Sequence, residues 1–247
     1  MASFSPTVSR SRALFRAFGL EQTDPAHFYG MVAADSAAHV GHYAPLDGKL
    51  LLDVGGGPGY FADAFRAAGA TYLALDADAG ELSLHGRSPE RGTTVLGSGL
   101  QLPFRTGSVD ICFSSNVLEH VPQPWTMADE MVRVTRPGGV VFLSYTIWLS
   151  PHGGHETSPW HYLGGKRALD RYERAHGKPP KNVFGESMYA VSVHEALRWA
   201  RRRESEGSVE VIEAFPRYHP RWAYWVVRVP GVREIVTWNL VLVLRKR

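Results

Sequence analysis

The hydrophobic pattern of the chain consists of short, continuous apolar runs separated by longer stretches with helical spacing. Apolar runs of this kind, bounded by glycine, proline or acidic residues, are typical of strands that are buried on both faces of a parallel sheet. The pattern predicts strands over residues 50–54, 71–75, 109–114, 140–145, 209–215 and 236–244.

Helices are predicted where apolar residues recur every three or four positions. They cover residues 60–68, with Gly69 as the stop, and 124–135. Ser192 and Glu195 form a capping box that opens a further helix. Near the N-terminus, Asp24 and Pro25 fit the cap and first turn of a helix whose buried side carries Tyr29, Val32, Ser36, Val40 and Tyr43. Alternating strands and helices predict an α/β fold with a doubly wound sheet.

A glycine-rich turn, Gly55-Gly56-Gly57-Pro58-Gly59, follows the first predicted strand and its Asp53. Glycines let a backbone approach a ligand closely. The dinucleotide fingerprint would require another glycine where the chain has Tyr60, and Pro58 removes a backbone donor that a diphosphate would use. The carboxylate of Asp53 suits a cationic ligand better than a diphosphate.

A second acid, Asp76, ends the next predicted strand and follows Asp53 by 23 residues. This separation is close to the roughly 20 residues expected for a ribose-binding acid in such folds. Asp76 would accept hydrogen bonds from ribose hydroxyls, whereas the alternative interpretation is a helix cap. S-adenosylmethionine fits both acids, because it carries a sulfonium, an ammonium, a ribose and an adenine but no phosphate.

Several further motifs follow in order along residues 50–146. In these motifs the chain resembles class I S-adenosylmethionine-dependent methyltransferases, and specifically their type 11 group. The matching blocks are residues 52–59, Leu75-Asp76-Ala77, residues 97–104, Val109-Asp110-Ile111, residues 114–120 without Ser115, and Arg136-Pro137-Gly138-Gly139. Nearly the whole chain also resembles an uncharacterised bacterial subgroup of these enzymes, which indicates no substrate.

The resemblance implies a Rossmann-like, seven-stranded, mostly parallel sheet whose last strand is antiparallel. It places the methionine part of S-adenosylmethionine among Asp53, Gly55, Gly57 and Gly59, the ribose on Asp76, the adenine against Ala77, and the reactive methyl near Asn116. Ser98 stands where the family usually has an acid, so adenine recognition falls to Ser98 and the backbone around Gly99 and Leu100. The product would be S-adenosylhomocysteine.

On this basis we expect one methyltransferase domain over residues 1–247. Residues 1–47 would form an N-terminal helical lid, 48–146 the cofactor-binding half, 147–191 an insertion on the substrate side after the fifth strand, and 192–247 the closing helix and strands. The insertion is rich in glycine, histidine and aromatic residues.

Candidates for acid–base catalysis lie in two places. His120 follows Asn116 at the end of the fourth expected strand, where open parallel sheets bind ligands. The insertion adds His155, Glu156 and His161, which are interpreted either as a base with substrate contacts or as structural loop residues. No metal site is predicted, because these residues lack the spacing of known zinc motifs.

The residues favour methyl transfer to a small molecule, with oxygen of a glycan, glycolipid or secondary metabolite preferred because a hydroxyl needs a base. Nitrogen and carbon acceptors stay open. One alternative is a non-catalytic module that binds S-adenosylmethionine and a partner. An NAD(P)-dependent reductase is disfavoured, since the third glycine and a Tyr-x-x-x-Lys motif are missing.

Charge and cysteine content add expectations about surroundings. The net charge of +3 is modest, and no nucleic-acid-binding module is recognised. Basic and aromatic residues interleave over 10–18 and 217–233, which indicates either peripheral contact with anionic lipid or a lipid-linked acceptor, or ordinary amphipathic helices. A single cysteine, no secretory signal and no membrane-spanning segment favour the cytoplasm. The oligomeric state is left open.

Overall fold

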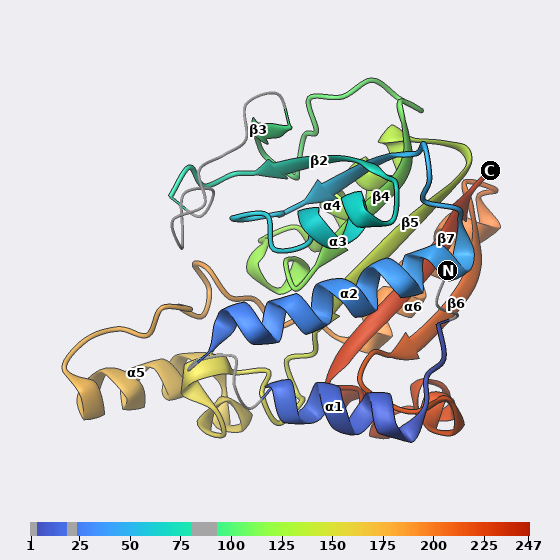
Figure 1. The fold of residues 1–247 in the computed structure, drawn as a ribbon. Helices are drawn as coiled ribbons and strands as arrows, with labels where there is room; N and C mark the ends of the chain where they lie inside the picture. The colour runs from blue at the N-terminus through green and yellow to red at the C-terminus, as the bar shows by residue number, and fades with distance from the viewer. Residues whose placement is uncertain (1–3, 19–23, 81–92) are drawn as a thin grey trace.

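The computed structural model describes residues 4–18, 24–80 and 93–247, and it contains one central sheet (Figure 1). Over these residues the sheet has seven strands in the order β3-β2-β1-β4-β5-β7-β6. Strands β1 to β5 pair in parallel, and β7 runs antiparallel to both β5 and β6. Their bounds are β1 Leu50–Val54, β2 Thr71–Asp76, β3 Thr94–Leu96, β4 Val109–Ser115, β5 Thr135–Thr146, β6 Val209–Pro216 and β7 Asn239–Lys246. The predicted fold class is confirmed.

Helices cover both faces of the sheet, and each face has its own hydrophobic core. Helices α1 (Val8–Phe18), α2 (Pro25–Tyr43) and α3 (Ala62–Ala67) cover the near face in Figure 1. Helices α4 (Pro124–Val134) and α6 (Val193–Ser205) cover the opposite face. The carboxyl ends of the parallel strands therefore meet at one edge, where loops from both layers converge.

The local signals at two helix starts act as predicted. The Asp24 side chain accepts a hydrogen bond from the His27 amide, and Val32, Ser36 and Val40 of α2 are fully buried. The Ser192–Glu195 capping box is present at the start of α6. Each cap satisfies amide groups that have no partner within the helix itself.

The segment after β5 contains little regular structure, as its composition indicates. It includes the 3-10 turns η3 (His155–Thr157) and η4 (Trp160–Leu163) and the helix α5 (Gly165–His176). Figure 1 shows α5 standing away from the sheet, and only its Gly165 and Ala168 are buried. The end of the segment returns to the sheet edge, where the Tyr189 amide donates to the Glu119 carbonyl.

Two predicted strand limits were wrong. The last strand was expected from residue 236, but residues Val232–Val236 form helix α7 and β7 begins at Asn239. The Glu234 carboxylate, which lies in α7, accepts hydrogen bonds from the amides of Val193 and His194 at the positive end of α6. These bonds favour a helical turn over a strand at residues 232–236. Strand β5 was expected from residue 140, and it already begins at Thr135.

The basic and aromatic residues near the two ends do not form one surface. Phe15 and Phe18 pack against Tyr218 and Trp238 inside the protein. Arg217 is only 1% exposed, so its expected place on a surface was wrong. Exposed residues of these stretches remain on α1, at Arg12 and Arg16, and on the turn η5 (Arg221–Arg228), where Trp222 is 71% exposed and Trp225 53%. Among the described residues, no helix has both the length and the apolar character to cross a membrane.

Candidate functional site

The glycine-rich turn lies between the ends of β1 and β2. The Gly55 amide donates to the Leu75 carbonyl at 2.7 Å, which continues the strand pairing into the turn. Gly55 has φ +81°, and a Cβ there would lie 2.4 Å from Cγ2 of Val117. Only glycine therefore fits both the backbone conformation and the close approach of the loop after β4.

Asp53 supports this turn from below. Its side chain is 1% exposed, and the hydroxyl of Tyr72 donates to its carboxylate at 2.6 Å. The pKa of Asp53 is raised to about 7, mainly by burial and further by the nearby Asp76, while the hydrogen bond from Tyr72 opposes the rise. The acid thus lies under the glycines in this structure, and its contact with a methionine group stays a prediction.

Asp76 lies beside the same turn, at the end of β2. One carboxylate oxygen accepts a hydrogen bond from the Gly57 amide at 3.0 Å, and the other accepts from the Asp78 amide at 3.0 Å. Ala77, next along the chain, is exposed. The second acid is therefore fixed at the mouth of the glycine turn, where a ribose-binding acid is expected.

The remaining predicted cofactor residues lie on neighbouring loops at this edge of the sheet. The Ser98 hydroxyl accepts a hydrogen bond from the Leu100 amide at 3.2 Å, which holds the turn around Gly99. Asn116 follows β4 with φ +57°, and its side-chain oxygen accepts from the Asn239 side chain at 2.8 Å. Helix α2 reaches the glycine turn through Tyr29, which stacks on Tyr60 with ring centroids 4.4 Å apart.

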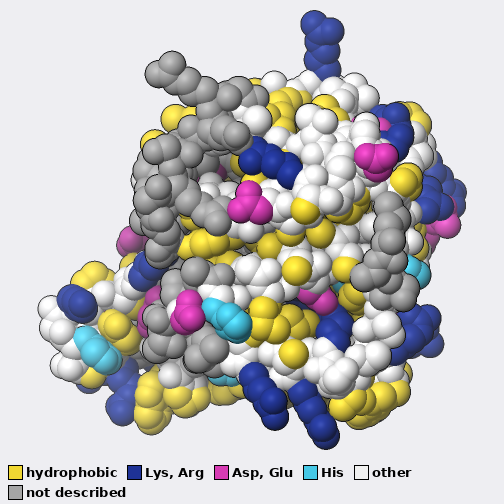
Figure 2. Space-filling view, viewed as in Figure 1, with side chains coloured by type: hydrophobic (Ala, Val, Ile, Leu, Met, Phe, Trp, Pro, Cys, Tyr) yellow, Lys and Arg dark blue, Asp and Glu magenta, His cyan; other side chains and the backbone are white. Residues whose placement is uncertain are grey.

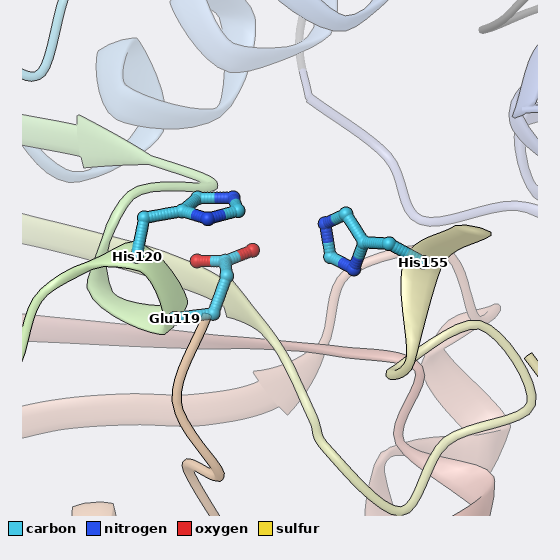
Figure 3. Close-up of side chains that lie close together, drawn as sticks. All are labelled: Glu119, His120 and His155. Carbon is cyan, nitrogen blue, oxygen red and sulfur yellow. The ribbon is translucent and has the colours of Figure 1, made fainter. Parts of the chain in front are cut away.

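Three side chains from two loops converge beyond Asn116, and we call them the open cluster: Glu119, His120 and His155. Figure 3 shows the two imidazole rings facing each other across the Glu119 carboxylate. One donor atom from each residue lies within 4.8 Å of the others. Glu119 and His120 belong to the turn η2 (Leu118–His120) after β4, whereas His155 comes from the segment after β5.

Glu119 and His120 are each anchored through one atom and leave another atom unused. Glu119 is 2% exposed; its Oε1 accepts from the Thr146 amide at 2.9 Å, while Oε2 has no partner among the described residues. Nδ1 of His120 lies 2.7 Å from the Ser187 carbonyl oxygen. Because a carbonyl oxygen only accepts, Nδ1 of His120 carries a proton, and Nε2 is the ring nitrogen left to face the rest of the cluster.

His155 completes the open cluster from the opposite side. Its backbone has φ +48°, an uncommon conformation for a residue other than glycine. Burial lowers its pKa to about 4, and the attraction of Glu119 only partly offsets this effect. The imidazole of His155 is therefore neutral near pH 7, with its ring centroid 5.3 Å from that of His120.

The other two predicted catalytic residues lie away from the open cluster. Both carboxylate oxygens of Glu156 accept hydrogen bonds from the Asn182 side chain. His161 is 1% exposed, with Nε2 3.0 Å from the Ser150 carbonyl and its ring against Trp148 and Tyr162. These contacts hold the segment after β5 together, so the predicted grouping of His155 with Glu156 and His161 is not what the structure assembles.

Glu119 is the residue that sequence reasoning did not select. It lies within the matching block of residues 114–120, yet only His120 of the two neighbours was assigned a catalytic role. The available signal was its place at the end of a parallel strand, the position where such sheets bind ligands.

The sequence matches a known protein family. Residues 52–143 match the family model described as a methyltransferase domain. An uncharacterised methyltransferase of Mycobacterium marinum is 53% identical over 98% of this chain and 96% of its own length. A second one, from Mycolicibacterium gilvum, is 54% identical over 97% of this chain and 95% of its own length.

Solved structures share the fold at much lower identity. An S-adenosylmethionine-dependent methyltransferase from Mesorhizobium loti superposes with a TM-score of 0.57 at 20% identity, covering 87% of this chain and 98% of that one. Geranyl diphosphate C-methyltransferase from Streptomyces coelicolor, in complex with Mg²⁺, geranyl diphosphate and S-adenosyl-L-homocysteine, has a TM-score of 0.53 at 15% identity, covering 92% and 84%.

Proposed function

Because the chain belongs to the methyltransferase family, we propose that it transfers the methyl group of S-adenosylmethionine to a hydroxyl oxygen of a small molecule. The observation that carries the choice of oxygen is the open cluster, which brings two imidazoles and a carboxylate together just beyond the end of β4. Methyl transfer to a neutral amine or a phenolate has less need of such groups.

S-adenosylmethionine would bind along the edge of the sheet where the parallel strands end. Asp76 would exchange its hydrogen bond to the Gly57 amide for the ribose hydroxyls, and the glycine turn would pass under the methionine part. Ser98, Gly99 and Leu100 would line the adenine. Asn116 would lie between the reactive methyl and the open cluster.

The chemical task of the protein is alignment. The sulfonium carbon is already activated, so the acceptor oxygen must be held in line with the methyl group and the leaving sulfur in a site that excludes water. An aliphatic hydroxyl must also lose its proton as the new bond forms. Glu119, His120 and His155 would act on that oxygen, since their side chains converge at one point of this edge.

The acceptor would enter between the N-terminal helices and the segment after β5. These two regions touch where Phe18 of α1 packs against His152, with ring centroids 4.7 Å apart. Residues 1–47 and 147–191 would therefore form the walls of the acceptor site, in the roles of lid and substrate-side insertion.

A glycan, glycolipid or secondary metabolite is the proposed acceptor class, and two surface features favour a lipid-linked one. Figure 2 shows basic side chains projecting along the edge of the near face where α1 lies. On η5, the exposed Trp222 and Trp225 line a hollow of about 750 Å³ together with Arg201, Arg221 and Arg228. Tryptophan beside arginine is typical of surfaces that meet anionic lipid head groups. Such a protein would act at the inner, cytoplasmic side of a membrane.

A labelling experiment tests this proposal. The purified protein is incubated with methyl-labelled S-adenosylmethionine and an extract of the source cells, and lipid and aqueous fractions are analysed by mass spectrometry. We expect a labelled methyl ether, with release of S-adenosylhomocysteine. A label on nitrogen or carbon would contradict the choice of oxygen. Tight cofactor binding without release of S-adenosylhomocysteine in any fraction would favour a non-catalytic binding module instead.

A further inference from the structure

The open cluster has the composition of a metal site. It offers two imidazole nitrogens and one carboxylate oxygen, and these donor atoms already lie within 4.8 Å of one another. Ligand atoms about 2.1 Å from a tetrahedral ion lie roughly 3.4 Å from one another. Side-chain rotations that move the donor atoms by about 1 Å would therefore bring all three within binding distance of one ion. Glu119 and His120 are neighbours, but His155 follows them by more than thirty positions, so sequence spacing does not reveal the three as a set.

The environment of Glu119 calls for a cation. The residue is only 2% exposed, and Oε2 of its carboxylate has no hydrogen-bond partner in the described part of the chain. A buried carboxylate oxygen without a partner costs free energy unless a proton or a positive charge satisfies it. Figure 3 shows this carboxylate lying between the two imidazoles.

The contacts around the open cluster also match those that orient metal ligands. Metal-binding histidines commonly donate their second ring N–H to a carbonyl, which fixes the ring and frees the other nitrogen. His120 makes this contact with Ser187. Ligating carboxylates are in turn held by hydrogen bonds, as Oε1 of Glu119 is by the Thr146 amide.

We propose that Glu119, His120 and His155 bind one divalent first-row transition-metal ion, for which Zn²⁺ is the test ion. Two nitrogens and one oxygen suit Zn²⁺ and its neighbours, whereas Mg²⁺ and Ca²⁺ prefer oxygen ligands throughout. Three protein ligands leave a fourth position open, which is the arrangement of catalytic rather than structural zinc sites.

The open position gives the site its role, and this step rests on the proposed function. An acceptor hydroxyl bound there would lose its proton to solvent more readily, because the ion stabilises the alkoxide. The alkoxide then forms the O–CH3 bond as the S–CH3 bond breaks, and the electron pair of that bond stays on sulfur. The products are the methyl ether and neutral S-adenosylhomocysteine.

Calorimetric titration with Zn²⁺ tests the site without any assay of activity. The full chain is first treated with a chelator, and wild type is compared with Glu119→Gln and His155→Ala. We expect one ion per chain for wild type and at least tenfold weaker binding for both variants. His152→Ala is the matched control, because it removes an imidazole three positions from His155 that packs edge-on against Phe18 and Trp238.

Thermal melts of each variant, with and without Zn²⁺, separate loss of a ligand from loss of the fold. Wild type and His152→Ala should be stabilised by Zn²⁺, and a folded His155→Ala protein should not. Equal binding by wild type and both variants, or no binding by wild type, would overturn the proposal. The double variant Glu119→Gln/His155→Ala measures how much Zn²⁺ binds to the remaining histidines of the chain, and this level is the background for the comparison.

The two proposals fail in different ways. If Zn²⁺ binds as expected and no labelled product forms, the metal site stands and the oxygen methyltransferase fails. If methyl transfer proceeds at full rate in the presence of chelator and wild type binds no Zn²⁺, the metal site fails and the methyltransferase stands.

Discussion

Two polar clusters, one buried and one half-buried, lie at the same edge of the sheet, and they differ in whether their hydrogen bonds within the described residues are complete. In the first, which we call the closed cluster, Arg217 donates to the hydroxyls of Ser36, Ser115 and Ser144 at 2.5–2.9 Å. In the open cluster, Glu119 keeps an unused buried oxygen and His120 an unused nitrogen. Ser115 and Glu119 are only four residues apart along the chain.

The difference indicates which cluster serves the fold and which serves chemistry. The closed cluster joins α2, β4 and β5 to the end of β6, and its hydroxyls already meet the guanidinium. Burial lowers the pKa of Arg217, which shows that the charge is poorly solvated there. The open cluster retains donor atoms that a ligand can use. The closed cluster should therefore control stability, and the open cluster should control turnover.

The largest expected effect comes from removing the centre of the closed cluster. Arg217→Ala leaves a cavity and three buried hydroxyls without their donor, so we expect the free energy of unfolding to fall by about 3 kcal/mol. Urea unfolding measures this change. Arg12→Ala, at an exposed position of α1, is the control and should change stability by less than about 0.5 kcal/mol. A similarly small change for Arg217→Ala would remove the distinction between the clusters.

Substitutions in the open cluster should change the rate of methyl transfer more than the stability of the fold. We expect His155→Ala to lower the rate of methyl transfer by about 100-fold or more, while S-adenosylmethionine affinity stays close to that of wild type. His161→Ala sharpens the contrast, because this buried ring holds the Ser150 carbonyl, and its loss should appear mainly as reduced thermal stability. Rates and melting temperatures of the two variants, measured side by side, test this. Full activity of His155→Ala would exclude it from the mechanism.

The cofactor residues provide an intermediate effect. Asp76→Ala removes one charge-assisted contact to the ribose, so we expect S-adenosylmethionine affinity to fall by about tenfold to thirtyfold. Glu156→Ala is the comparison, since its contact with Asn182 lies outside both the cofactor loops and the open cluster. Calorimetric titration of both variants decides the point, and unchanged affinity in Asp76→Ala would disprove the ribose assignment.

The smallest effect concerns the pH dependence of stability. The pKa of Asp53 is raised to about 7 in the folded protein, so the contribution of this acid is present at low pH and is lost as the pH rises through 7. Between pH 6 and 8 this loss is about 1 kcal/mol. Asp53→Asn still accepts from Tyr72 and does not ionise, so its stability should fall less over that interval. Parallel curves for the two proteins would contradict a buried, shifted Asp53.

Much of the fold could be predicted because its signals are local. The apolar runs, the Asp24 cap, the Ser192–Glu195 box and the glycine turn each depend on residues close together in the sequence. Strand β3 is too short to give such a signal, and β7 starts late because Glu234 binds the start of α6 from forty positions away.

The candidate site could be predicted only in part, for a related reason. The cofactor residues lie next to strand ends, so strand order brings them together. The partners of His155 depend instead on how the segment after β5 folds back over η2. Glu156 and His161 have the same residue types as the open cluster, yet contacts with Asn182 and Ser150 direct them elsewhere. Arg217 gives no local sign that three serines surround it.

The most direct test of the account is a paired measurement on Glu119→Gln, which keeps the size of the side chain and removes its charge. The dissociation constant for S-adenosylmethionine and the rate of labelled methyl transfer to the cell-extract acceptor are compared with wild type. We predict an unchanged dissociation constant and at least a 100-fold slower transfer. A wild-type rate of transfer in Glu119→Gln would contradict the claim that the open cluster acts on the acceptor.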